Sequence, residues 1–90
     1  MKNNKQKHFD SSLPFFESSH FRDSLNRKCT NYGLNPNKTL EKIKNRKPTH
    51  IISDARGIKC VYEIAEYKIT IPLIYKYDEY EMVTFLIERK

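Results

Sequence analysis

The stretch THIISDARGIKCVYEIAEYKITIPLIY, residues 49–75, decides the fold. Its apolar residues alternate with polar ones, and a period of two is typical of β-strands that bury one face. We expect three strands, at residues 49–53, 58–64 and 69–75, separated by turns at residues 54–57 and 65–68. Because these turns are short, consecutive strands are expected to pair in antiparallel fashion.

A last strand follows a turn at residues 77–80. Its predicted inward residues are Val83, Phe85 and Ile87. Thr84 alternates with them, so we expect its hydroxyl on the opposite face of the sheet. Pro72 is expected on the other face of the preceding strand, and because proline has no N–H to give to a ladder, an edge or a bulge is predicted there.

Two helices are predicted before the strands. The first begins at Ser18 or Ser19, since a serine can accept a hydrogen bond from a free N–H of the first turn, and Gly33 caps its end. The second begins near Asn35 and stops before Pro48. The expected buried residues are Phe21, Leu25, Cys29 and Tyr32 in the first helix, and Leu40 and Ile43 in the second.

Together these elements predict an α+β domain in which two N-terminal helices pack on a four-stranded antiparallel sheet, in the order ααββββ. Residues 18–90 form this domain. Residues 1–17 show neither a helical nor a strand period and are expected to be a flexible basic tail.

Length and composition exclude several classes of protein. Ninety residues make one domain, and no apolar run approaches the ~20 residues that span a membrane. Two cysteines, Cys29 and Cys60, are too few for a disulfide framework or a zinc site, so we interpret them as buried thiols in a reducing compartment. No secretory signal is expected from the polar start, and the predicted location is the cytoplasm.

The formal net charge of +6 is unevenly distributed. Residues 1–50 contain eleven Lys or Arg and four Asp or Glu, a balance of +7, whereas residues 51–90 contain six and seven, a balance of −1. This asymmetry favours a polyanion, such as nucleic acid, as the partner of the first half. A basic surface that only confers solubility has the same composition.

A cationic stripe on the second helix narrows this prediction. Lys38, Lys42 and Arg46 recur every four residues and therefore share one helical face, where like charges repel by a few tenths of a kcal/mol per pair. A phosphate backbone beside the stripe turns that repulsion into attraction. The predicted nucleic-acid-binding residues are these three and Arg22.

His20 is the candidate for proton transfer. It lies in the first turn of the first predicted helix, where the helix dipole favours the neutral imidazole that a general base requires. Asp23, three residues later, can orient the ring. The alternative is an exposed helix-start residue with no catalytic role.

Four short stretches carry a resemblance: SHFRD at residues 19–23, YGL at 32–34, Gly57, and MVTFL at 82–86. Their layout, over residues 18–89, resembles small domains near the RelE/ParE toxins and, more broadly, the ribonuclease fold shared by barnase, EndoU, colicin D and RelE.

The resemblance implies a metal-independent endoribonuclease-like toxin domain, in which a ribose 2′-OH attacks the adjacent phosphate. His20 is then the base or acid, Thr84 positions the phosphate, and Arg56 or Lys59 stabilises its developing charge. The expected partners are RNA and an antitoxin or immunity protein, and no cofactor or metal is expected. The alternative is a non-catalytic accessory domain of phage or ParE-like type that binds nucleic acid or protein.

Overall fold

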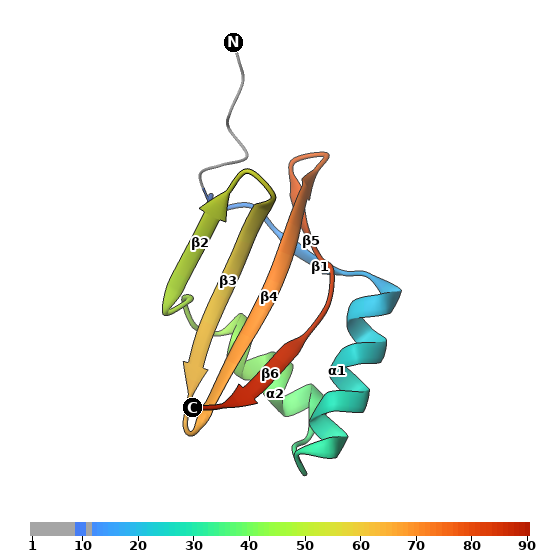
Figure 1. Cartoon of the computed structure of the whole chain (residues 1–90). Helices are drawn as coiled ribbons and strands as arrows, with labels where there is room; N and C mark the ends of the chain where they lie inside the picture. The colour runs from blue at the N-terminus through green and yellow to red at the C-terminus, as the bar shows by residue number, and fades with distance from the viewer. Residues whose placement is uncertain (1–8, 11) are drawn as a thin grey trace.

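The chain folds into one mixed sheet with two helices packed on one of its faces (Figure 1). The computed structural model describes residues 9–10 and 12–90. The elements are β1 (Phe15–Glu17), α1 (Ser19–Asn31), α2 (Pro36–Lys44), β2 (His50–Asp54), β3 (Gly57–Ile64), β4 (Tyr67–Lys76), β5 (Glu79–Met82) and β6 (Leu86–Arg89).

The sheet has six strands, with five in the order β1-β5-β4-β3-β2 and β6 paired with β4. The predicted ααββββ order and the four-stranded antiparallel sheet are therefore wrong. One strand precedes the helices, and β1 pairs in parallel with β5, with Phe15 opposite Tyr80. A three-residue strand carries no alternating pattern of its own, so only its pairing partner defines it.

The second correction is that the last predicted strand is two strands. Leu73 of β4 lies opposite Met82 of β5, and Thr70 lies opposite Leu86 of β6. Two residues of β4 thus face three on the other side, which makes a bulge. Pro72 lies in this interval of the unbroken β4, so the predicted bulge at Pro72 is confirmed, with the extra residue on the β5–β6 side.

The bulge also shifts which residues point inward. Met82 is fully buried beside Leu73, whereas Val83 is only partly buried and hydrogen-bonds through its N–H to the Pro72 carbonyl. The prediction that Val83 points inward is therefore wrong. Phe85 is buried as predicted, because the extra residue of the bulge returns the inward and outward alternation to the predicted one.

Local signals place both helices as expected. The Ser18 hydroxyl accepts a hydrogen bond from the Phe21 N–H at 3.0 Å, and the Asn35 side chain accepts one from the Lys38 N–H at 2.9 Å. Gly33 follows α1 with a φ of +72°, in the left-handed region that glycine tolerates. Capping therefore fixes where each helix begins.

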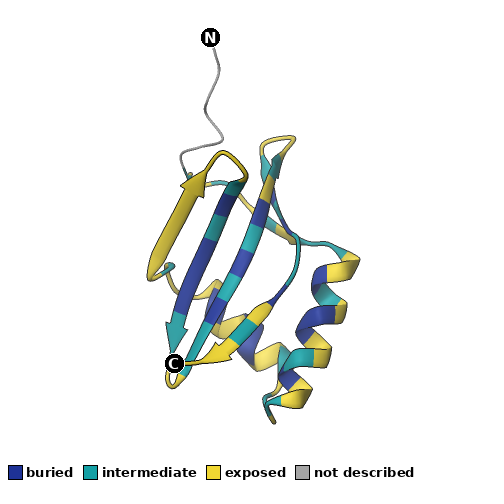
Figure 2. Ribbon diagram, in the orientation of Figure 1, coloured by how far each residue is buried: buried dark blue, intermediate teal, exposed yellow. Residues whose placement is uncertain are grey.

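The core lies between the helices and the sheet. Figure 2 shows buried and less buried residues alternating along β4, whereas the middle of β3, at residues 60–62, is buried throughout. All five residues of β2, at the sheet edge, are exposed. The fully buried large side chains include Phe21, Leu25, Ile43, Ile71, Tyr80 and Phe85.

Part of the predicted tail contributes to this packing. The Phe9 ring stacks on the Tyr80 ring with 5.3 Å between centroids, and β1 belongs to the sheet. Residues 1–8 and 11 of the predicted tail lie outside the described residues.

Candidate nucleic-acid interface

Helix α2 separates an apolar face from a charged one. Thr39, Leu40 and Ile43 are buried against the core, and they recur at the three- and four-residue spacing of one helical side. Asn35 caps the helix and Pro36 occupies its first turn, where the missing N–H costs no hydrogen bond. The buried side fixes the helix, so the opposite side points into solvent.

That solvent side, with the loop after it, carries the basic face, which we define as Lys38, Lys42, Arg46 and Lys47. All four are exposed, and no acidic side chain of the described residues lies within ion-pair distance of them. Segment 36–53 contains five Lys or Arg and one acidic residue, Glu41. The basic face is therefore a local excess of positive charge that no ion pair in the described part of the chain neutralises.

The end of α2 brings three of these cations to one place. Lys42, Arg46 and Lys47 border an open hollow of about 450 Å³, whose other walls are Glu41, Asn45 and Thr49. Lys38 lies one helical turn before Lys42. The predicted stripe thus extends into the loop through Lys47, which the four-residue spacing did not include.

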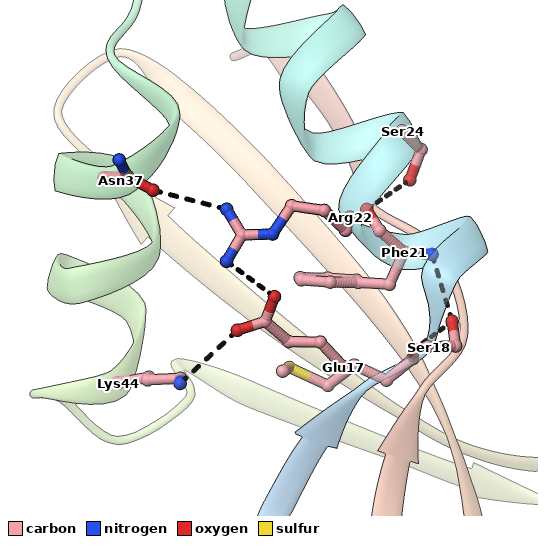
Figure 3. A network of polar contacts seen from close by, with 8 residues as sticks. Glu17, Ser18, Phe21, Arg22, Ser24, Asn37 and Lys44 are labelled. Carbon is pink, nitrogen blue, oxygen red and sulfur yellow. Dashed lines mark hydrogen bonds and ion pairs between the residues drawn. The ribbon is translucent and has the colours of Figure 1, made fainter.

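Arg22, the fourth predicted nucleic-acid contact, is engaged elsewhere. Its guanidinium lies 2.8 Å from a Glu17 carboxylate oxygen and donates to the Asn37 side chain at 3.3 Å (Figure 3). The other Glu17 oxygen lies 3.6 Å from the Lys44 ammonium. Glu17 of β1 therefore links α1 to α2. Its negative charge offsets Arg22 and Lys44, so we do not count these two residues in the basic face.

His20 and Thr84 are both associated with α1. His20 is exposed in the first turn. Ser24, one turn later, is buried and accepts a hydrogen bond from the Phe85 N–H at 2.9 Å. The Thr84 hydroxyl lies 3.2 Å from the Ser24 hydroxyl, so Thr84 faces the helix, and its predicted place on the opposite face is wrong. The bulge is the reason.

Arg56 and Lys59 lie apart from this pair. Arg56 is exposed in the turn between β2 and β3, where its N–H donates to the Asp54 side chain at 2.8 Å. Lys59 of β3 alternates with the buried Ile58 and Cys60, so its side chain lies on the sheet face away from the helices. The four predicted catalytic residues therefore do not surround one point.

An apolar pocket, which the sequence did not predict, adjoins the basic face. Its volume is about 440 Å³. It is lined by Phe9, Leu13 and Phe15 from the N-terminal segment, by Ile43, Lys44, Arg46, Lys47 and Pro48 from α2 and its loop, and by Tyr62 and Met82 of the sheet. Arg46 and Lys47 border both this pocket and the open hollow.

The buried titratable groups hold their protons. Burial raises the pKa of the Cys60 thiol to about 12 and raises the pKa of the neighbouring Tyr62 hydroxyl as well. Burial also raises the pKa of Cys29, against a hydrogen bond with Thr39 that lowers it. Both thiols are free, as predicted, and they are protonated core residues at neutral pH.

Within residues 9–10 and 12–90, no group of three or more His, Cys, Asp or Glu side chains could hold a metal ion. The described helices are too short or too polar to cross a membrane. Comparison of the chain with protein-family models, curated proteins and solved structures gave no match.

Proposed function

We propose that this chain is a nucleic-acid-binding module that holds a phosphate backbone, with RNA as the expected ligand, on the basic face of α2. The observation that carries the proposal is the cluster of four exposed cations without an acidic partner, all between residues 38 and 47. Elsewhere, five described Lys or Arg side chains have acidic partners: Arg22, Lys68, Lys76, Arg89 and Lys90. The four other described cations without an acidic partner lie in two separate places, Arg27 and Lys28 in α1 and Arg56 and Lys59 in and after the turn between β2 and β3.

The physical basis is the release of counterions. A polyanion that contacts the basic face frees the ions condensed on its phosphates, and this release drives binding without regard to sequence. The same contact relieves the repulsion between Lys38 and Lys42, which are four residues apart on one helix. Because the core fixes α2 through Leu40 and Ile43, these charges are held in place before the ligand arrives.

Binding to a labelled single-stranded RNA tests the proposal. The variant Lys38→Gln/Lys42→Gln/Arg46→Gln should bind about 10- to 100-fold more weakly at 0.1 M salt, measured by fluorescence anisotropy. The matched control, Lys68→Gln/Lys76→Gln/Lys90→Gln, removes the same charge elsewhere and should bind much as the parent does. Equal losses in the two variants would mean that total charge, and not the basic face, controls binding.

The metal-independent endoribonuclease is the second candidate, and the position of Thr84 favours it. Thr84 hydrogen-bonds to Ser24, which lies one helical turn after His20. The two residues paired by the resemblance therefore belong to the same end of α1. Since Arg56 and Lys59 lie elsewhere, this candidate rests on His20 and Thr84 alone.

Incubation of the protein with total RNA in EDTA, followed by mapping of the cut ends, tests the second candidate. Cleavage should leave cyclic phosphate ends, and His20→Ala should lower the rate by about 10²–10⁴-fold while RNA binding stays unchanged. A parent protein that binds RNA but does not cut it would refute the endoribonuclease and leave the binding module standing. An antitoxin or immunity protein belongs to this second candidate only.

The cytoplasmic location is part of the proposal. Cys29 and Cys60 are free and buried, which is the arrangement typical of proteins in a reducing compartment.

A further inference from the structure

The pocket beside the basic face has the size and lining of a ligand site. Its volume of about 440 Å³ falls in the range of about 300–1,000 Å³ typical of small-molecule sites. Its walls include the rings of Phe9, Phe15 and Tyr62, together with the side chains of Leu13 and Met82. Such a lining favours a flat apolar or aromatic group over a polar one.

The rings from the N-terminal segment are held in place by their neighbours. Phe9 stacks on Tyr80, and Phe15 meets both rings edge-on, with centroids 6.0 Å from Phe9 and 5.7 Å from Tyr80. Phe15 is also fixed by the parallel pairing of β1 with β5. An aromatic wall that is already ordered loses little conformational entropy when a ligand stacks on it.

The rim of the same pocket is cationic. Lys44, Arg46 and Lys47 border the opening, and Arg46 and Lys47 also border the open hollow of the basic face. A nucleic-acid backbone bound to the basic face therefore passes the mouth of the pocket. The flat groups attached to that backbone are its bases.

We infer that the pocket between the N-terminal segment and the end of α2 receives an unpaired base of the bound nucleic acid, while Arg46 and Lys47 hold the adjoining phosphates. This inference rests on the proposed function. It makes the ligand a single strand, because a base inside a duplex must first be unstacked and unpaired, at a cost of a few kcal/mol.

The polar atoms of the structure further define this site. None of the buried side-chain nitrogen or oxygen atoms among the described residues lacks a hydrogen-bond partner. Tyr62 lines the pocket, and its hydroxyl interacts with Cys60. Stacking and shape then hold the base, which is the mode of single-strand binders that tolerate any sequence.

The test compares two strands with equal numbers of phosphates. One is a single-stranded RNA of about 12 nucleotides, within the usual site size, and the other is the same backbone with abasic spacers in place of all bases. The parent should bind the normal strand about 5- to 150-fold more tightly, as expected for one base stacked on an aromatic wall. Fluorescence anisotropy measures both affinities.

Two pocket variants and one control assign the difference to the pocket. Leu13→Trp fills the pocket and Phe15→Leu removes a ring. Each variant should bind the normal strand with an affinity close to that for the abasic strand. Lys38→Gln, on the basic face away from the pocket, should weaken the binding of both strands by the same factor. Circular dichroism checks that each variant is folded. The comparison of the normal and abasic strands uses the parent protein, so it can be made even if a variant does not fold.

The outcomes separate the two proposals. If the parent binds the normal and the abasic strand equally, the pocket holds no base, and the binding proposal for the basic face stands. If it binds neither strand, both proposals fail. If it prefers the normal strand but both pocket variants keep that preference, the bases are recognised elsewhere and the inference is overturned.

Discussion

Helices α1 and α2 follow one another in the chain and pack on the same side of the sheet, but their exposed surfaces differ. Helix α1 buries Phe21, Ser24, Leu25 and Cys29, and its Arg22 has a carboxylate partner in Glu17. Helix α2 buries three residues, and its Lys44 shares Glu17 with Arg22, but its exposed Lys38 and Lys42 have no acidic partner among the described residues. The difference shows that a helix fixed by its buried side can carry mutually repelling charges on the other, and we propose that these charges are what a polyanion contacts.

The largest expected effect lies in α1. Phe21 is fully buried and meets the Phe85 ring edge-on at 6.2 Å, so Phe21→Ala should lower the free energy of unfolding by about 3–5 kcal/mol. Lys38→Ala, in α2, should change it by no more than about 0.5 kcal/mol. Urea denaturation measures both. A loss below 1 kcal/mol for Phe21→Ala would remove the structural contrast between the helices.

A smaller loss is expected at Ser24. Its hydroxyl accepts the N–H of Phe85 and donates to the Phe21 carbonyl at 3.0 Å, all in the buried interior. Ser24→Ala leaves the Phe85 N–H without this partner, which should cost about 1–3 kcal/mol. Thr84→Val, at a half-buried position, should cost less. Similar losses for the two would show that Ser24 is not what anchors the bulge to α1.

The two buried thiols give a third test, in alkaline solution. Burial raises the pKa of Cys29 in α1 and of Cys60 beneath the helices, the latter to about 12 from 9.0. The unfolded chain therefore loses these protons first as the pH rises. The contribution of the protonated thiols to the free energy of unfolding is complete below pH 9 and is lost between pH 9 and about 12. Over that range the free energy of unfolding falls with a limiting slope of about 1.4 kcal/mol per pH unit for each thiol.

Cys60→Ala should flatten this pH dependence relative to the parent, whatever its effect at neutral pH. Urea denaturation at several pH values above 9 measures the slope. A parent whose stability rises over that range would contradict the burial of the thiols as protonated groups.

The smallest effect is expected at His20, which is exposed on the same helix as Ser24. His20→Ala should change the free energy of unfolding by no more than about 0.5 kcal/mol. A larger loss, measured in the same urea experiment, would give His20 a structural role and weaken its use as a probe of RNA cleavage.

Local sequence signals predicted the helices and the hairpins well. Ser18, Asn35 and Gly33 act through neighbouring backbone groups, so their effect is visible in the sequence. Pro72 marked the bulge beside β4 for the same reason, since its missing N–H is a property of the residue itself.

Features that depend on distant contacts escaped prediction. Strand β1 exists through its pairing with β5, and the Glu17 link to Arg22 joins elements that the tail assignment kept apart. Thr84 faces α1 because the bulge adds one residue, and a shift of one residue moves a side chain to the other face. Ser24 looks unremarkable within a helix, and only the fold brings the Phe85 N–H to it.

The basic face was partly predictable. Lys38, Lys42 and Arg46 share a four-residue spacing, which the sequence displays. The aromatic pocket beside them was not, because Phe9 and Phe15 lie in a segment without periodicity and reach the pocket only through packing on Tyr80.

The salt dependence of RNA binding tests the central claim most directly. The parent and the Lys38→Gln/Lys42→Gln/Arg46→Gln variant are titrated with the same single-stranded RNA over a range of salt concentrations. Each phosphate contact to a single strand contributes a slope of about −0.7 in log K against log salt, so the variant's slope should be shallower by about 2. Parallel lines for the two proteins would show that these cations contact no phosphate and would contradict the account.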